Sequence, residues 1–180
     1  MKKFLTTLLW IVIIGAALFG IYYVLPEYPQ NFIRSFVQPI VNSQAKTRIT
    51  GVQNLAAAGV EGQTYKSVLE KNTGMSCWTY DVSYKANGEI EQEVVTYRGN
   101  GASVNMKDYS DYNGKLYTSC SVKMEFVITP NKNDKTKSDV NIYPYLDGVK
   151  MNIQDGKHGE QNKKVLEIIL QQLYGGVQEE

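Results

Sequence analysis

The most constraining feature of this chain is an uncharged, strongly apolar segment close to its N-terminus. It covers residues 4–25, from Phe4 to Leu25, and contains no Asp, Glu, Lys, Arg or His. As one helix with a rise of about 1.5 Å per residue, a segment of this length matches the roughly 30 Å hydrocarbon core of a bilayer. The segment therefore predicts a transmembrane signal-anchor helix over residues 4–25.

The charges that flank this segment predict its orientation. Lys2 and Lys3 precede it, whereas Arg34 is the only basic residue among residues 26–45. Cytoplasmic flanks of membrane helices carry an excess of Lys and Arg. We therefore expect residues 1–3 in the cytoplasm and the C-terminal domain on the other side of the membrane, periplasmic or extracellular.

Aromatic residues are placed as expected for a retained anchor. Tyr22 and Tyr23 fall where the helix should leave the hydrocarbon, as in an interfacial aromatic belt, and Pro26 then ends the helix. The residues that we assign to the membrane anchor are Phe4, Trp10, Tyr22, Tyr23 and Leu25.

A cleaved signal peptide is the alternative interpretation of the same segment. Residues 4–14 would be its apolar region, and Gly15-Ala16-Ala17 would be a small-residue cleavage site. The apolar run continues well beyond Ala17, where a cleaved signal normally becomes polar, so we favour a retained anchor.

Residues 26–180 are long enough for one domain with its own core. We divide this domain into a juxtamembrane helical region, 26–74, and a sheet with a C-terminal helix, 75–180. The first helical pattern, over residues 30–43, has an apolar stripe that could pack on the domain or lie along the membrane surface. Arg34 is the only basic residue on this helix, so the basic face of a strong membrane-surface helix is absent, and we favour packing against protein.

Two further helical patterns cover residues 49–58 and 64–71, after which the apolar period changes from 3.6 to 2. A turn is expected at Asn87-Gly88, another at residues 99–101, and a third at Asp147-Gly148. These predict six strands and then a final helix over residues 160–174, with the strands at residues 78–84, 89–97, 102–106, 116–128, 140–145 and 149–153. Helices segregated from an antiparallel meander indicate an α+β domain, with the C-terminal helix packed on the sheet.

The sequence contains no catalytic motif. The chain has 19 Lys and Arg against 18 Asp and Glu, a net charge of +1, and no run of one sign, so we expect no nucleic-acid partner. His158 is the only histidine and has no neighbouring nucleophile or acid in a recognisable pattern. Glu89, Glu91 and Glu93 share a strand face that we expect to be solvated. We predict no catalytic residue, no cofactor and no metal site.

The two cysteines, Cys77 and Cys120, predict one disulfide. An even cysteine count outside the cytoplasm favours a bond over two separate thiols. Because Trp78 and Tyr80 share one face of their strand, Cys77 points to the other face, and the bond therefore requires a bulge or a strand start at Cys77.

Aromatic residues of the sheet form the one candidate binding surface. Side chains of this type line grooves for sugars or apolar ligands, although in a sheet they are more often core and cross-strand pairs. The members of this set are Trp78, Tyr80, Tyr84, Tyr97, Tyr143 and Tyr145.

These patterns together predict a non-enzymatic, single-pass protein of a bacterial cell envelope. Its expected partners are the membrane and other envelope proteins, or further copies of itself, in a secretion, appendage or transport assembly. A module that binds a lipid, glycan or peptide is the first alternative. A surface fibre subunit is the second, because pilins resemble this chain in pairing an N-terminal apolar helix with a sheet, although the glycine-then-glutamate processing motif is absent here.

Overall fold

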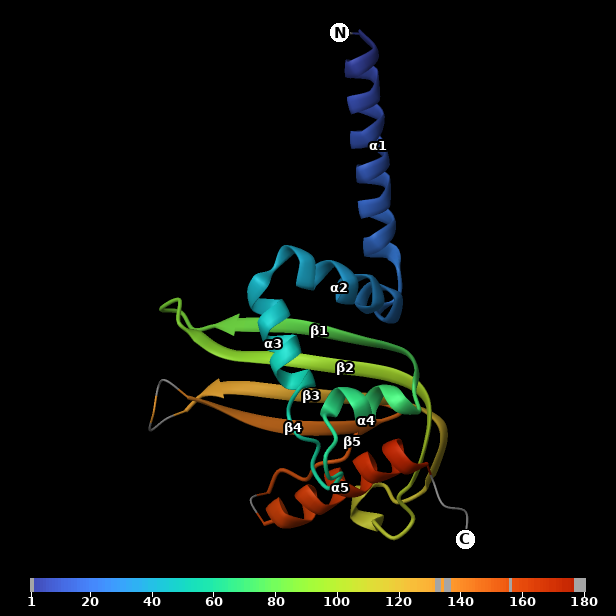
Figure 1. Cartoon of the computed structure of the whole chain (residues 1–180), viewed down its shortest axis with the longest axis vertical. Coiled ribbons are helices and arrows are strands. Elements are labelled where there is room, and N and C mark those ends of the chain that lie inside the picture. The colour runs from blue at the N-terminus through green and yellow to red at the C-terminus, as the bar shows by residue number, and fades with distance from the viewer. Residues whose placement is uncertain (1, 132–133, 135–136, 156, 177–180) are drawn as a thin grey trace.

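The structure is a computed structural model that describes residues 2–131, 134, 137–155 and 157–176, without the side chains of residues 2–6, 8–11, 18–19 and 28. Its helices and strands follow the order that the sequence predicts (Figure 1). They are α1 (Lys2–Val24), α2 (Glu27–Val41), α3 (Ser43–Gln53), α4 (Tyr65–Lys71), β1 (Gly74–Tyr84), β2 (Ile90–Asn105), a 3-10 turn (Ser110–Tyr112), β3 (Leu116–Pro130), β4 (Ser138–Leu146), β5 (Val149–Lys150) and α5 (Gly159–Gly175).

The predicted α+β class is confirmed, but the described sheet has five strands rather than six. It is an antiparallel meander in the order β1-β2-β3-β4-β5. The expected turn at residues 99–101 is instead a bulge, in which Gly99 pairs with Val122 and Ala102 pairs with Cys120. Because Gly101 has a φ of 83°, the chain kinks there and continues along the same partner strand, so two predicted strands are one.

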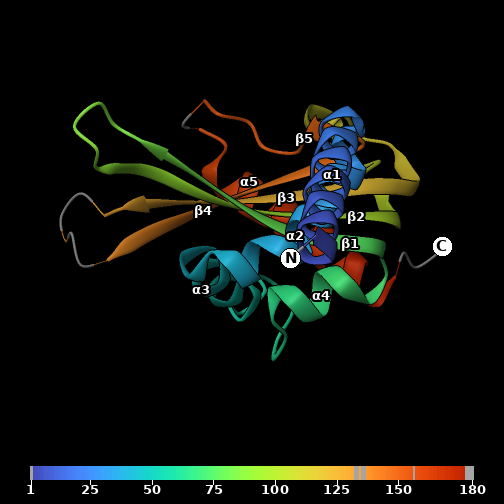
Figure 2. The same ribbon diagram turned by 90° about the horizontal axis from the view of Figure 1, so that it is seen from above.

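Helices cover one face of the sheet. Figure 2 shows α3 and α4 on the same side of the strands. The core between the two layers is built from buried aliphatic and aromatic side chains of α3, α4, α5 and the facing rows of β1–β3. Tyr65 and Phe126 stack edge to face with ring centroids 4.9 Å apart, and Trp78 lies 4.9 Å from Tyr97. These rings fill the space between helices and sheet.

The N-terminal helix α1 stands away from the rest of the molecule (Figure 1). We predicted a transmembrane helix over residues 4–25, and the structure confirms that this segment is helical as far as Val24. Within the part of the chain that is described, none of the helices combines the length and apolar character needed to cross a membrane. The side chains of Phe4 and Trp10 lie outside the described residues; Tyr23 is exposed, and its ring meets that of Tyr22 edge on at 5.6 Å.

Candidate docking surface

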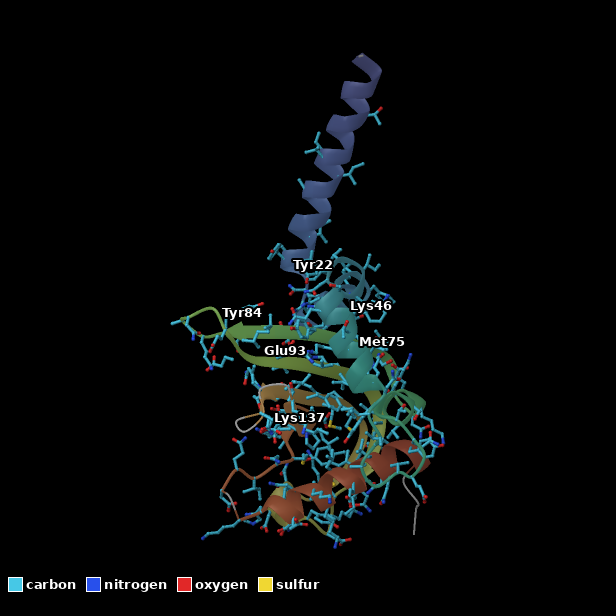
Figure 3. The ribbon with its side chains drawn as sticks, turned by 60° about the vertical axis from the view of Figure 1, so that its left-hand side comes forward. Tyr22, Lys46, Met75, Tyr84, Glu93 and Lys137 are labelled. Atoms are coloured by element: carbon cyan, nitrogen blue, oxygen red, sulfur yellow. The ribbon has the colours of Figure 1, made fainter. Side chains whose placement is uncertain are left out.

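The structure does not bring the six predicted aromatic residues into one surface. Trp78, Tyr80 and Tyr97 are buried beneath the helices. Tyr84 is exposed at the far end of β1 (Figure 3), and Tyr143 and Tyr145 are half-buried on β4. Half of the set is therefore core, and of the three tyrosines outside the core only Tyr143 and Tyr145, both on β4, lie close together.

Cys77 and Cys120 are separate buried thiols, so the predicted disulfide is not formed. Cys77 pairs with Arg98 of β2, whereas Cys120 of β3 pairs with Ala102. Strand β2 lies between them, and two strand spacings of about 4.8 Å exceed the Cα separation that a disulfide bridges. Burial raises the pKa of both thiols, that of Cys120 to about 11, which keeps them protonated and unreactive at neutral pH.

His158 belongs to the turn that precedes α5. Its Nδ1 lies 2.7 Å from Asp155 Oδ2, while Asp155 Oδ1 accepts hydrogen bonds from the backbone N–H groups of Lys157 and His158. The His158 hydrogen bond and these N–H groups hold the pKa of Asp155 below its ordinary value. The pair shapes a loop, and its geometry is that of a capped turn rather than of an acid–base site.

Glu93 is buried, which corrects the expectation of a solvated face. Figure 3 labels Glu93 on β2. Its Oε1 accepts hydrogen bonds from Tyr80 Oη at 2.7 Å, Gln44 Nε2 at 2.9 Å and Arg48 Nε at 3.0 Å, and Arg48 Nη2 lies 2.6 Å from Oε2. Burial alone would raise the pKa of Glu93, but the hydrogen bonds from Arg48, Tyr80 and Gln44 outweigh it and lower the pKa. This ionised carboxylate fastens α3 to β1 and β2.

The sequence did not predict that Glu93 is buried, because Glu89, Glu91 and Glu93 alternate along the strand. Three glutamates at this spacing are typical of one exposed row. The available signal was on α3, where Gln44 and Arg48 stand one helical turn apart beside the buried Ala45 and Ile49. Among the described residues, no group of three or more His, Cys, Asp and Glu side chains is arranged to hold a metal ion.

A polar and aromatic patch covers the sheet face opposite the helices. Tyr145 Oη donates to Glu125 Oε2 at 2.8 Å, and Lys123 Nζ lies 2.9 Å from Glu125 Oε1 and 3.7 Å from the centre of the Tyr145 ring. Lys150 Nζ lies 4.1 Å from the centre of the Tyr143 ring. We name this half-buried set the open face: Lys123, Glu125, Tyr143, Tyr145 and Lys150.

The second unusual surface is on α2, whose polar side faces the protein. Gln38 donates through Nε2 to the backbone carbonyl of Tyr80 and accepts the Tyr80 N–H at 2.8 Å, as a neighbouring strand would. Arg34 Nη2 lies 2.6 Å from Asp81 Oδ1, and Glu27 Oε1 accepts from Arg98 Nη2 at 3.1 Å. Helix α2 therefore closes the free edge of β1, which protects that edge from pairing with another chain.

The apolar side of α2 consequently faces outward, which makes the expected packing of this stripe against protein wrong. We name it the outer stripe, and its members are 41% (Ile33), 62% (Phe36), 48% (Val37), 83% (Ile40) and 75% (Val41) exposed. The sequence showed the stripe but not its direction, because the polar contacts of Gln38 and Arg34 with β1 arise only in the fold.

Comparisons with known proteins add no relative: no protein-family model matches the chain, no curated protein matches it, and no solved structure matches it.

Proposed function

We propose that this protein is a non-enzymatic, single-pass component of a cell envelope, whose α+β domain docks onto partner proteins in a larger membrane assembly. In this proposal α1 is the membrane anchor, with Met1 in the cytoplasm and the domain on the other side. The single observation that carries the proposal is α1 itself, a helix that carries no charge from residue 4 onward and extends away from the domain.

The exposure of α1 supports its role as an anchor. Val12, Ile14 and Val24 are 60%, 54% and 85% exposed, which is costly in water for contiguous apolar residues and favourable in lipid. Figure 1 shows that α1 does not fold back onto the domain. A second phase or a partner must therefore cover it.

The open face supports docking to a partner protein. Tyrosines are enriched at protein interfaces, where the aromatic ring supplies contact area and a polar rim surrounds it. Burial alone would raise the pKa of Glu125, but the hydrogen bonds that Glu125 accepts from Lys123 and Tyr145 outweigh it and lower the pKa. The patch therefore stays charged at neutral pH.

The alternative of a ligand held between sheet and helices finds less support. Such a module needs a cavity in that layer, and the described layer is occupied by the stacked rings of Tyr65, Trp78, Tyr97 and Phe126.

The proposal is tested in cells of the native host with the full chain carrying a photo-crosslinking side chain at Tyr143, on the open face. The matched control carries the same group at Lys163, an exposed position on α5. We expect the protein to remain with membranes after an alkaline wash, and we expect crosslinks from position 143 but not from position 163. Release by the wash, or recovery of monomer alone from both positions, would contradict the proposal.

A further inference from the structure

We propose that the outer stripe of α2 lies in the interfacial layer of the bilayer that α1 crosses, so that the domain sits directly on the membrane in one orientation. This inference rests on the proposed anchor function of α1. Its occupant is a lipid surface, and the stripe is a second, shallow membrane contact rather than a second anchor.

The outer stripe continues the apolar surface of α1. Only Leu25 and Pro26 separate the two helices, and Gln30 Nε2 donates to the Leu25 carbonyl at 2.7 Å, which ties the first turn of α2 to the end of α1. Tyr22 and Tyr23 lie at this junction (Figure 3 labels Tyr22), where an interfacial belt is expected. Lipid that surrounds the lower end of α1 therefore reaches α2.

The direction of α2 fits a membrane plane. Figures 1 and 2 show α2 running across α1 rather than continuing it, on the side of the domain from which α1 projects. Gln38 points to β1, and at 3.6 residues per turn Ile40 lies on nearly the opposite side of the helix. The stripe thus faces the side where a bilayer around α1 would be.

The contacts between α2 and the sheet make this orientation rigid. Glu27, Arg34 and Gln38 hold the helix to Arg98, Asp81 and Tyr80 along its length. A contact of the stripe with lipid therefore orients the whole sheet, with β1 as the strand nearest to the membrane and α5 on the far side of the domain (Figure 1).

The absence of a basic face on α2 agrees with a tethered contact. A free interfacial helix gains affinity for anionic lipids from its Lys and Arg residues. On α2 the one basic residue, Arg34, instead forms an ion pair with Asp81. Helix α2 does not need this affinity, because the adjacent anchor makes its contact intramolecular and gives it a high effective concentration at the surface.

The test uses nitroxide labels on the full chain, reconstituted in vesicles of phosphatidylcholine and phosphatidylglycerol. Single cysteines are introduced by Ile40→Cys on the stripe, Val12→Cys on α1 and Val149→Cys on β5, an exposed apolar position at the far side of the domain. The native Cys77 and Cys120 are 2% and 1% exposed, so labelling is directed to the new thiols. Collisions with oxygen, which concentrates in lipid, are compared with collisions with a water-soluble nickel chelate.

We expect the oxygen-to-nickel ratio at position 40 to exceed that at position 149 several-fold and to lie below that at position 12. Equal ratios at 40 and 149, with a lipid value at 12, would overturn this inference and leave the anchor intact. A water value at 12 would overturn the anchor and this inference with it. Dipolar broadening at 40 without a raised oxygen ratio would show a second copy on the stripe, which also overturns the inference.

Discussion

Helices α2 and α5 are both amphipathic, and they use their two faces in opposite ways. Helix α5 buries its apolar stripe, with Val165, Ile169 and Leu170 at 0% exposure, whereas the most exposed member of the outer stripe of α2, Ile40, reaches 83%. Both helices also fix a glutamine on a strand backbone, Gln38 on Tyr80 and Gln172 on Asn105. The comparison teaches that an apolar stripe on a helix predicts an apolar environment but does not say whether this environment is the protein core or another surface. The polar contacts on the other side of the helix decide which way the stripe faces.

The largest expected effect is on the α5 side of the comparison. Leu170→Ala should lower the free energy of unfolding by about 3 kcal/mol, because it leaves a cavity beneath a fully buried side chain. Denaturant unfolding of the full chain in mild detergent, followed by circular dichroism, measures this. A loss below about 1 kcal/mol would mean that α5 is not part of the core.

The second largest effect on the free energy of unfolding is expected for Glu93, whose hydrogen bonds with Arg48 and Gln44 tie α3 to the sheet. Glu93→Gln should cost about 2 kcal/mol at pH 7, since it removes the charge that Arg48 pairs with in a buried setting. Because the pKa of Glu93 is lower in the folded state, its contribution is fully present above the unfolded value of about 4.3 and is lost as pH falls through the folded pKa.

The pH dependence supplies the control for this variant. The unfolding free energy of the wild-type chain should therefore fall more steeply below about pH 5 than that of Glu93→Gln, while Glu91→Gln, at an exposed position, should follow the wild type. Parallel curves for all three proteins would show that Glu93 is not held ionised by its partners.

The hydrogen bonds of Gln38 and Gln172 to strand backbones should make smaller and equal contributions to the free energy of unfolding. Gln38→Ala and Gln172→Ala should each cost about 1 kcal/mol, the usual net contribution of such hydrogen bonds. Hydrogen exchange separates them: Gln38→Ala should speed exchange of the Tyr80 N–H alone, and Gln172→Ala that of Asn105 alone. Unchanged exchange at Tyr80 in Gln38→Ala would refute the closure of the β1 edge by α2.

The smallest effect on folding is expected on the outer stripe. Ile40→Ala should change the free energy of unfolding by less than about 0.5 kcal/mol, because the side chain contacts little protein. The same denaturation experiment as for Leu170→Ala measures this. A loss near that of Leu170→Ala would remove the contrast between the two helices.

Local patterns predicted most of the fold correctly. The period of the apolar residues located α2, α5 and the long strand β3, and Asp147-Gly148 marked the last hairpin, with both residues at positive φ as an Asp-Gly turn requires. At Asn87-Gly88 only Gly88 has positive φ. The predicted number of strands was wrong because the glycine-rich composition of residues 99–101 suits a bulge as well as a turn.

The candidate site was less predictable, because it depends on contacts between distant segments. Glu93 is buried by Gln44 and Arg48, and the direction of the outer stripe is set by Tyr80 and Asp81. The prediction of a disulfide was wrong for the same reason, because only the strand register shows that β2 separates Cys77 from Cys120.

The most direct test of the central claim is neutron reflectometry of the full chain in a supported bilayer, which gives the protein density as a function of depth. The account predicts protein density within the hydrocarbon layer, from α1, and continuous protein density that begins in the headgroup layer, from α2, with α5 at the outer limit. A water-filled layer between the headgroups and the domain, or no protein density in the hydrocarbon, would contradict it.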